Sequence, residues 1–133
     1  LSKAYYDKAI QNESIEFYQK SIDSFKTLIS LGYKRPYVYR NIAIIYQQLD
    51  DYVSAENILL DMKEVYPQEL GCYTQLSLLN IEIENKKSEN QRDYKKAYEY
   101  YEEALKISNG EGDSSLQQLT SLIEELKFKG WIN

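Results

Sequence analysis

Histidine is absent from this sequence of 133 residues, and cysteine occurs once, as Cys72. The absence of histidine removes the side chain that most often serves as a general base or as a metal ligand. A single cysteine can form neither an internal disulfide nor a metal site built from several thiolates. We therefore expect no catalytic residues, no cofactor and no metal, and we predict that the chain is not an enzyme.

Two further patterns that could carry chemistry are incomplete. The glycines at 110 and 112 precede a predicted helix, but the Lys-Ser/Thr tail and the preceding strand of a phosphate-binding loop are missing. The carboxylate pairs Asp50–Asp51 and Glu102–Glu103 fall at a predicted helix cap and on a predicted solvated helix face. Neither pattern supports a catalytic site.

The sequence also lacks any apolar run near the roughly 18 residues of a membrane-spanning helix, and it has no signal peptide. Its formal net charge is −5, which disfavours a nucleic acid or an anionic membrane surface as a partner. The net charge is +1 over residues 1–34 and −2 over each of 35–68, 69–109 and 110–133, so no segment is strongly polarised. We predict that the chain binds no nucleic acid, does not insert into membranes and is cytoplasmic.

What the sequence does contain is helical spacing of apolar residues between Pro36 and Pro67. The first half of this stretch places an i, i+3, i+4, i+7 pattern on one helical face, with Tyr39, Ile42, Ala43 and Tyr46. The second half forms another such face, with Tyr52, Ala55, Leu59 and Met62. Between them, Asp50 or Asp51 can accept backbone N–H groups at a helix start. The stretch is predicted to be a helical hairpin whose two apolar faces meet.

The same pattern recurs with a period of 34 residues. Tyr39 becomes Tyr5 one period earlier and Tyr73 one period later. In the second helix of the third copy the step is 42, because this copy carries eight additional residues between its helices, within the segment 85–93. The inserted segment is polar throughout, so it is either a solvated loop or about one extra turn on each flanking helix.

With this period and these residue types, the sequence resembles the tetratricopeptide repeat (TPR) family. The resemblance covers residues 1 to about 107 and is weakest in the first copy, where Lys8 and Asn12 stand at apolar positions and Ser21 replaces a small alanine. It implies an all-α fold, a right-handed α-solenoid of three helical hairpins followed by a C-terminal capping helix. We expect one domain, 1–133, with repeats at about 2–35, 36–69 and 70–109, an insertion at 85–93 and a capping helix at 113–129.

Seven helices are expected, at 2–12, 15–31, 37–49, 52–66, 70–84, 94–107 and 113–129. Asn12 and Ser14 are the predicted caps around the first turn, and Gly32 supplies a left-handed stop. By residue propensity alone 37–46 would be a strand, but the repeat overrules that interpretation. The last helix is expected to open at Ser114 with a capping box. Its apolar stripe should cover the end of the array, as repeat proteins require, with Leu116, Leu119, Ile123 and Leu126.

In such an array, a second stripe on each first helix faces the hollow side of the stack. Aromatic, Arg, Asn and exposed aliphatic residues on that stripe suit the capture of a peptide. Alternatively, these residues are ordinary surface positions, although Ile44 and Leu78 would then be exposed apolar groups in register. The predicted partner-binding groove comprises Tyr6, Ile10, Tyr37, Arg40, Asn41, Ile44, Gln47, Thr74, Gln75 and Leu78.

We predict a non-catalytic protein–protein interaction module that binds a peptide or partner protein in this concave groove. The alternative is a structural spacer or a self-association module, a homo-oligomer without a peptide ligand. Some TPR domains clamp the C-terminal carboxylate of heat-shock chaperones, but of that pattern only Asn41 matches here. The order of repeats and the ending LIEELKFKGWI are also similar to the helical C-terminal region of some bacterial serine/threonine protein kinases. That resemblance, together with a first residue other than Met, implies a scaffold within a larger regulatory protein.

Overall fold

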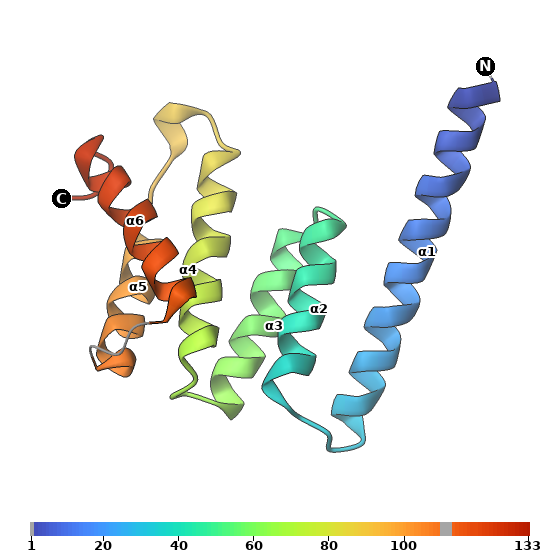
Figure 1. The fold of residues 1–133 in the computed structure, drawn as a ribbon, viewed down its shortest axis with the longest axis horizontal. Coiled ribbons are helices and arrows are strands. Elements are labelled where there is room, and N and C mark those ends of the chain that lie inside the picture. Colours follow the sequence, from blue (N-terminus) through green and yellow to red (C-terminus); the bar gives the residue numbers. More distant parts are fainter. Residues whose placement is uncertain (1, 110–112) are drawn as a thin grey trace. The chain divides into compact units, whose positions relative to one another are not determined.

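The computed structural model of the protein describes the backbone of residues 2–109 and 113–133, with side chains from residue 11 onward. Across these ranges the secondary structure is helical, with six α-helices, one short 3₁₀ helix and no strand (Figure 1). The predicted all-α fold class is confirmed. Contacts between Cα atoms divide the chain into two compact units, Leu1–Ile58 and Leu59–Asn133, and the boundary falls inside the third helix.

The first unit contains α1 (Ser2–Ser30), α2 (Pro36–Gln48) and the beginning of α3 (Tyr52–Val65). α1 and α2 pack side by side (Figure 1). α1 ends at Ser30 and is followed by Gly32, whose φ is +93°, and the N–H of Tyr33 donates to the carbonyl oxygen of Leu28 at 2.9 Å. This is the helix stop that the sequence predicted. The core of the unit holds most of the predicted α2 face and some neighbours: Ile22, Val38, Tyr39, Ile42, Ala43 and Ala55.

The turn between α2 and α3 depends on two consecutive aspartates. Asp50 adopts the left-handed backbone region, with φ +58°. The carboxylate of Asp51 accepts the backbone N–H of Ser54 at 3.2 Å and the Ser54 hydroxyl at 2.7 Å. Asp51 is thus a helix cap, as predicted. Because residues 36–48 are helical, the strand propensity of this stretch is overridden.

The turn predicted at Asn12–Ser14 is wrong, because α1 runs without interruption from Ser2 to Ser30. The first repeat has no equivalent of the turn residues Asp50 and Asp51. One period earlier, these two positions are occupied by Glu16 and Phe17. Glutamate is a good helix former, and a phenylalanine side chain cannot accept a backbone N–H. The first repeat is therefore one long helix and not a hairpin.

The second unit contains the rest of α3, then α4 (Leu70–Asn85), the 3₁₀ helix η1 (Glu89–Gln91), α5 (Lys95–Ser108) and α6 (Ser114–Phe128). α4 packs against both α5 and α6 (Figure 1). The Ser77 hydroxyl of α4 donates to the Ala97 carbonyl of α5 at 2.6 Å. Tyr101 of α5 donates to the Thr120 hydroxyl of α6 at 3.1 Å. The predicted faces of these helices are buried: Tyr73, Leu76, Ser77, Asn80, Tyr94, Ala97, Tyr101, Ala104, Leu116, Leu119, Ile123 and Leu126.

The insertion at 85–93 is a folded loop with a single 3₁₀ turn and does not extend both helices. Glu84, which is 7% exposed, accepts the backbone N–H of Asp93 at 2.8 Å and pairs with Lys87 at 2.7 Å. The guanidinium of Arg92 donates to the carbonyls of Lys87 and Asn85, at 3.0 and 3.1 Å. One buried carboxylate and one arginine therefore hold the loop.

α6 is capped by Asp113 and not by the predicted Ser114. The Asp113 carboxylate accepts the backbone N–H groups of Ser115 at 2.8 Å and Leu116 at 3.2 Å. A carboxylate is favoured over a hydroxyl here because its charge complements the positive end of the helix dipole. Residues 110–112, which include the two glycines that precede this cap, lie outside the described residues.

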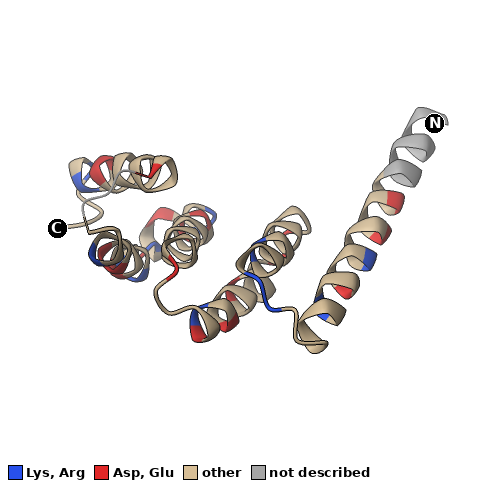
Figure 2. Ribbon diagram, turned by 60° about the horizontal axis from the view of Figure 1, so that its bottom comes forward, with Lys and Arg blue, Asp and Glu red and all other residues tan. Residues whose placement is uncertain are grey.

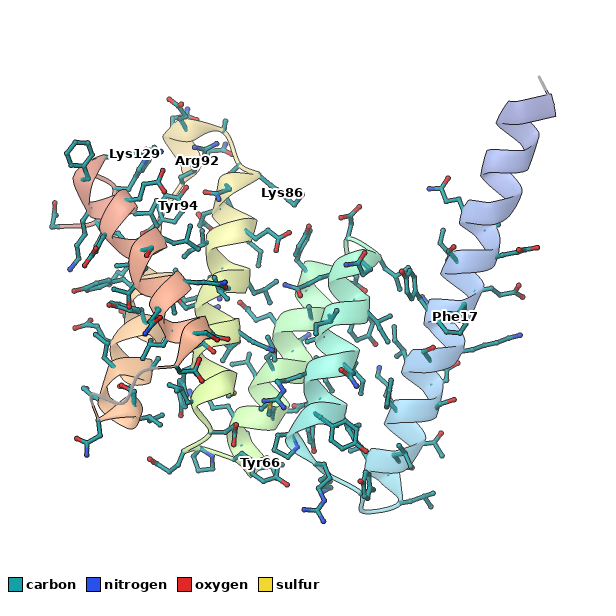
Figure 3. All side chains as sticks on the ribbon, viewed as in Figure 1. Phe17, Tyr66, Lys86, Arg92, Tyr94 and Lys129 are labelled. Atoms are coloured by element: carbon teal, nitrogen blue, oxygen red, sulfur yellow. The ribbon has the colours of Figure 1, made fainter. Side chains whose placement is uncertain are left out.

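The chain ends in a small aromatic cluster on the second unit. After Gly130, whose φ is +85°, the Trp131 N–H donates to the Leu126 carbonyl at 2.9 Å. The Trp131 ring meets the Tyr94 ring edge-on at 5.5 Å and lies 5.8 Å from the Arg92 guanidinium. Figure 3 shows Arg92 and Tyr94 beside each other near the C-terminal end of α4. The cluster joins the end of the capping helix to the inserted loop.

Candidate functional site

The exposed face of α2 carries five of the predicted groove residues. Tyr37 is 44% exposed and Ile44 is 45% exposed. These two residues lie seven positions apart, which is two helical turns, so they point to the same side of α2 about 10 Å apart along its axis. Between and beside them are the half-buried side chains of Arg40, Asn41 and Gln47. The structure therefore leaves this set on one accessible helix face, and that the face binds a partner stays a prediction.

Tyr37 belongs to an aromatic pair that the sequence did not predict. Its hydroxyl lies 3.0 Å from the Tyr33 hydroxyl, and the two rings meet edge-on at 6.2 Å. The Arg35 guanidinium lies 5.8 Å from the Tyr33 ring. The hydrogen bond to Tyr33 raises the pKa of the Tyr37 phenol above its ordinary value. The i, i+4 spacing of the tyrosines was a usable signal, but Tyr33 lies before the helix and outside the repeat stripe.

The residues predicted on α4 do not all reach solvent. Gln75 and Leu78 are half-buried, but Thr74 is only 2% exposed. The Thr74 hydroxyl donates to the Gly71 carbonyl at 3.2 Å and is satisfied inside its own helix. Placing Thr74 in the groove was therefore wrong. α4 packs on two helices of its unit, so its buried surface is wider than the single stripe that the repeat assigned.

Tyr6 and Ile10, the predicted groove residues of the first repeat, lie outside the described side chains. Their backbone belongs to α1. Because α1 is continuous, the first helix of repeat one does not exist as a separate element that could present them.

Acidic and basic residues are interspersed along the described helices (Figure 2), but the net charge differs between the two units. Residues 1–58 contain seven basic and seven acidic residues, whereas residues 59–133 contain nine basic and fourteen acidic residues. The whole net charge of −5 therefore belongs to the second unit. In the described part of the chain, no cluster of three or more metal-binding side chains occurs. None of the described helices is both long enough and apolar enough to cross a membrane.

The second unit has a cavity of about 460 Å³ on the side of α5 that bears Glu99. Two lysines and two glutamates line it, so its formal charge is balanced. The Tyr73 hydroxyl at its wall already donates to the Pro67 carbonyl at 2.7 Å. This cavity thus offers no preference for a ligand of one charge. Its lining residues are Lys63, Tyr73, Lys96, Glu99, Tyr100 and Glu103.

Helical hairpins with period-34 packing faces define an all-helical repeat protein. The structure is similar to the crystal structure of the Sgt2 TPR domain from Aspergillus fumigatus, with a TM-score of 0.62 and 21% sequence identity. The match covers 94% of this chain and 78% of that chain. No protein-family model and no curated protein sequence matches the chain. The chain has the TPR-like fold that its sequence predicted.

Proposed function

We propose that the chain is a non-catalytic protein-interaction module that binds a peptide segment of a partner protein on the exposed face of α2. One observation carries this function. Tyr37 and Ile44, each nearly half exposed, stand on one side of α2 with Arg40 and Asn41 between them. Apolar anchors beside an amide and a guanidinium are the composition of a peptide-binding surface. The TPR-like fold supports the assignment by analogy.

Each side chain of this face has a role in the proposed complex. Tyr37 and Ile44 supply apolar contact, and Asn41 can both donate to and accept from the peptide backbone. Arg40 supplies a charge-assisted hydrogen bond to an acidic group. Gln75 and Leu78 form a second, smaller stripe on α4 that is proposed to contribute to partner binding in the second unit. Affinity should be modest, because the surface is short and a flexible peptide loses conformational entropy when it binds.

A panned peptide library tests the proposal. A phage-displayed library selected on the full chain yields a peptide, which is then titrated by calorimetry into wild type and two double variants. Arg40→Ala with Ile44→Ala should weaken binding by about tenfold or more, because both positions lie on the proposed surface. The matched control, Glu99→Ala with Glu102→Ala on exposed α5 positions, should bind like wild type.

If the Glu99→Ala/Glu102→Ala variant loses affinity for the peptide and the Arg40→Ala/Ile44→Ala variant does not, the binding site lies on the outer surface of α5. If no peptide binds and the chain instead dimerises as its concentration rises, the module serves self-association. Equal thermal stability of both double variants shows that any loss of affinity is not a loss of fold.

The proposed setting is a larger, cytoplasmic regulatory protein. It rests on the resemblance of the C-terminal sequence to the helical region of bacterial kinases. Sequencing the full gene tests it, and an adjoining catalytic domain is the expected finding.

A further inference from the structure

One stretch of the first unit carries charge of a single sign. Residues 24–49 contain four basic residues and no acidic residue, whereas all seven acidic residues of 1–58 lie before or after this stretch. A boundary at residue 34 divides the stretch, so segments of one repeat length do not show it. It spans the last turns of α1, the connector and α2. Its positive charges are Lys26, Lys34, Arg35 and Arg40.

The connector between α1 and α2 presents part of this charge beside apolar groups. Lys34 and Arg35 are exposed, and the connector has the colour of Lys and Arg where it enters α2 (Figure 2). Leu31 is 78% exposed and Tyr33 is 42% exposed in the same connector. Together with two residues of the α2 face, these side chains form what we call the basic–aromatic patch: Leu31, Tyr33, Lys34, Arg35, Tyr37 and Arg40. The patch thus continues the proposed peptide-binding face beyond the start of α2.

The backbone of the connector is fixed at both of its ends. The N–H of Tyr33 donates to the Leu28 carbonyl at 2.9 Å, and the N–H of Val38 donates to the Arg35 carbonyl at 3.0 Å. Pro36 restricts the backbone further where α2 begins. The side chains of the patch therefore project from an ordered turn, so a ligand that binds them has less conformational entropy to remove.

The contacts within the patch leave hydrogen-bond donors for a carboxylate. The Arg35 guanidinium lies 5.8 Å from the centre of the Tyr33 ring. A contact of this kind uses the face of the guanidinium and leaves its N–H edge available to a carboxylate. The Tyr37 hydroxyl donates to the Tyr33 hydroxyl at 3.0 Å, so the Tyr33 O–H can donate to a further acceptor. Positive charge and O–H donors beside exposed apolar groups complement an acidic ligand that also carries an apolar residue.

We propose that the partner peptide of the α2 face is acidic, with carboxylates that bind the basic–aromatic patch and an apolar residue that reaches Ile44. This inference rests on the proposed function, because it names the chemistry of the peptide that α2 binds. Ile44 lies eight residues beyond Pro36, which is about 12 Å along the helix axis. An extended peptide covers that distance in about four residues. The partner segment should therefore carry neighbouring Asp or Glu residues and, about four residues away, an aliphatic or aromatic residue.

A short acidic segment suits the patch better than a long polyanion does. Exposed charges separated by more than about 8 Å are largely screened at physiological salt, so a few acidic residues interact chiefly with the nearest cations. A nucleic acid or an anionic membrane extends farther. It would also meet the carboxylates that follow and precede the positive stretch in the sequence, beginning with Asp23 and Asp50.

Panning a phage-displayed peptide library on the full chain tests the inference. Wild type should select peptides enriched in Asp and Glu, whereas the charge-reversed variant Lys34→Glu/Arg35→Glu should not. The control variant Lys95→Glu/Lys106→Glu changes exposed positions of α5 and alters the net charge of the chain by the same amount. It should still select acidic peptides. Far-UV circular dichroism and melting temperature establish that each variant is folded.

Two synthetic peptides then give affinities by calorimetry. One has the most frequent selected sequence, and the other replaces each of its Asp and Glu residues by the corresponding amide. For the acidic peptide, Lys34→Glu/Arg35→Glu should raise Kd by about tenfold or more, and Lys95→Glu/Lys106→Glu by less than about twofold. The amide peptide should bind wild type about tenfold more weakly than the acidic one. Raising NaCl from about 0.05 to about 0.5 M should weaken binding of the acidic peptide about fivefold or more.

The outcomes separate this inference from the proposed function. Selected peptides without an excess of Asp and Glu, or an equal loss of affinity in both charge-reversed variants, would overturn the acidic partner. The proposed function survives that result if Arg40→Ala with Ile44→Ala still weakens binding, whereas a library that yields no binder overturns both. Tighter binding of single-stranded RNA or phosphatidylserine vesicles, lost in Lys34→Glu/Arg35→Glu, would identify a different polyanion. A dimer of the unliganded chain that the same variant abolishes would identify a second copy as the occupant, and either result overturns the inference.

Discussion

At the scale of single residues, Ala55 tests the predicted helix packing of the first unit. It is fully buried on α3. Replacing its methyl group by the side chain of leucine should overpack the contact and lower the free energy of unfolding by about 1–3 kcal/mol. Urea denaturation measures the change. Val53→Leu, at a position 74% exposed on the same helix, should stay within about 0.5 kcal/mol of wild type. Equal stabilities of the two variants would show that the repeat register is wrong.

Cys72 gives a prediction about alkaline pH. Its side chain is fully buried, its thiol lies 3.3 Å from the Leu59 carbonyl oxygen, and burial raises its pKa to about 11 from an ordinary value near 9. The folded state thus keeps a proton that the unfolded state loses. The resulting stability is present below pH 9 and is lost as pH rises toward about 11.

Comparing wild type with Cys72→Ala isolates this contribution from the titration of tyrosines and lysines. Between pH 8 and pH 10.5, the unfolding free energy of wild type should fall more than that of the variant. Parallel curves for the two proteins would contradict the assignment.

Residue spacing predicted the buried faces better than the exposed ones. Tyr39, Ile42 and Ala43 were identified from their i, i+3, i+4 spacing and are buried as expected. Thr74 was placed in the groove, although α4 packs on two helices and leaves that position 2% exposed. A periodic pattern gives the centre of a buried face, whereas the width of that face depends on how many neighbours the helix acquires.

At the scale of elements, we expect Glu16 and Phe17 to decide whether the first repeat forms one continuous helix or a helical hairpin. Glu16→Gly with Phe17→Asp supplies the left-handed residue and the capping carboxylate that the second repeat has at Asp50 and Asp51. The variant should break α1 and fold its first part back. Phe17→Ala alone removes the ring without supplying a cap, so it should leave the helix continuous.

Spin labels on cysteines introduced at Ser2 and Ser30 report the difference as a distance. In a continuous helix these positions are about 42 Å apart, and in a hairpin they approach to within about 15 Å. The buried thiol of Cys72 should not be labelled, since its raised pKa keeps it protonated at neutral pH. A long distance in the double variant would mean that something other than these two residues holds α1 straight.

The ends of helices could be predicted from the sequence wherever a glycine stop or a capping aspartate was present. Gly32 was predicted to follow a helix end and Asp51 to cap a helix start, and both predictions are confirmed. The turn predicted in the first repeat was wrong because Phe17 stands where the other repeats have a capping aspartate. The missing cap was not recognised in the sequence. The loop at 85–93 could not be resolved in advance, because its order depends on Glu84 and Arg92 bonding to backbone groups several residues away.

At the scale of the whole molecule, the second unit depends on its last helix. Leu119 and Ile123 of α6 are at most 1% exposed, and α6 packs against α4 and α5. Deleting 113–133 should therefore expose an apolar surface and cause aggregation or a lower melting temperature. Deleting only 132–133 leaves α6 intact and serves as the control. A truncated chain, 1–112, that stays soluble and as stable as the full chain would rule out a capping role.

The class of the molecule was the easiest feature to predict, because a 34-residue period repeats the same packing problem several times. Three copies of an aromatic at one position, Tyr5, Tyr39 and Tyr73, outweigh the strand propensity of any single copy. The same 34-residue repeat register also predicted which side of α2 is exposed. The position of the cavity beside Glu99 did not, because it depends on how side chains from three helices fill the surface.

Trp131 is the only tryptophan of the chain, and it lies against Tyr94 and Arg92 in the second unit. The 14 tyrosines are spread over both units, with eight in residues 1–58 and six in residues 59–133. Tryptophan emission therefore reports on one corner of the second unit, whereas tyrosine emission reports on the entire chain. Recorded together during denaturation, the two signals coincide if both units unfold as one cooperative block and separate if each unit melts alone. Because the single indole ring lies in the second unit, intrinsic fluorescence can show whether the two units unfold cooperatively.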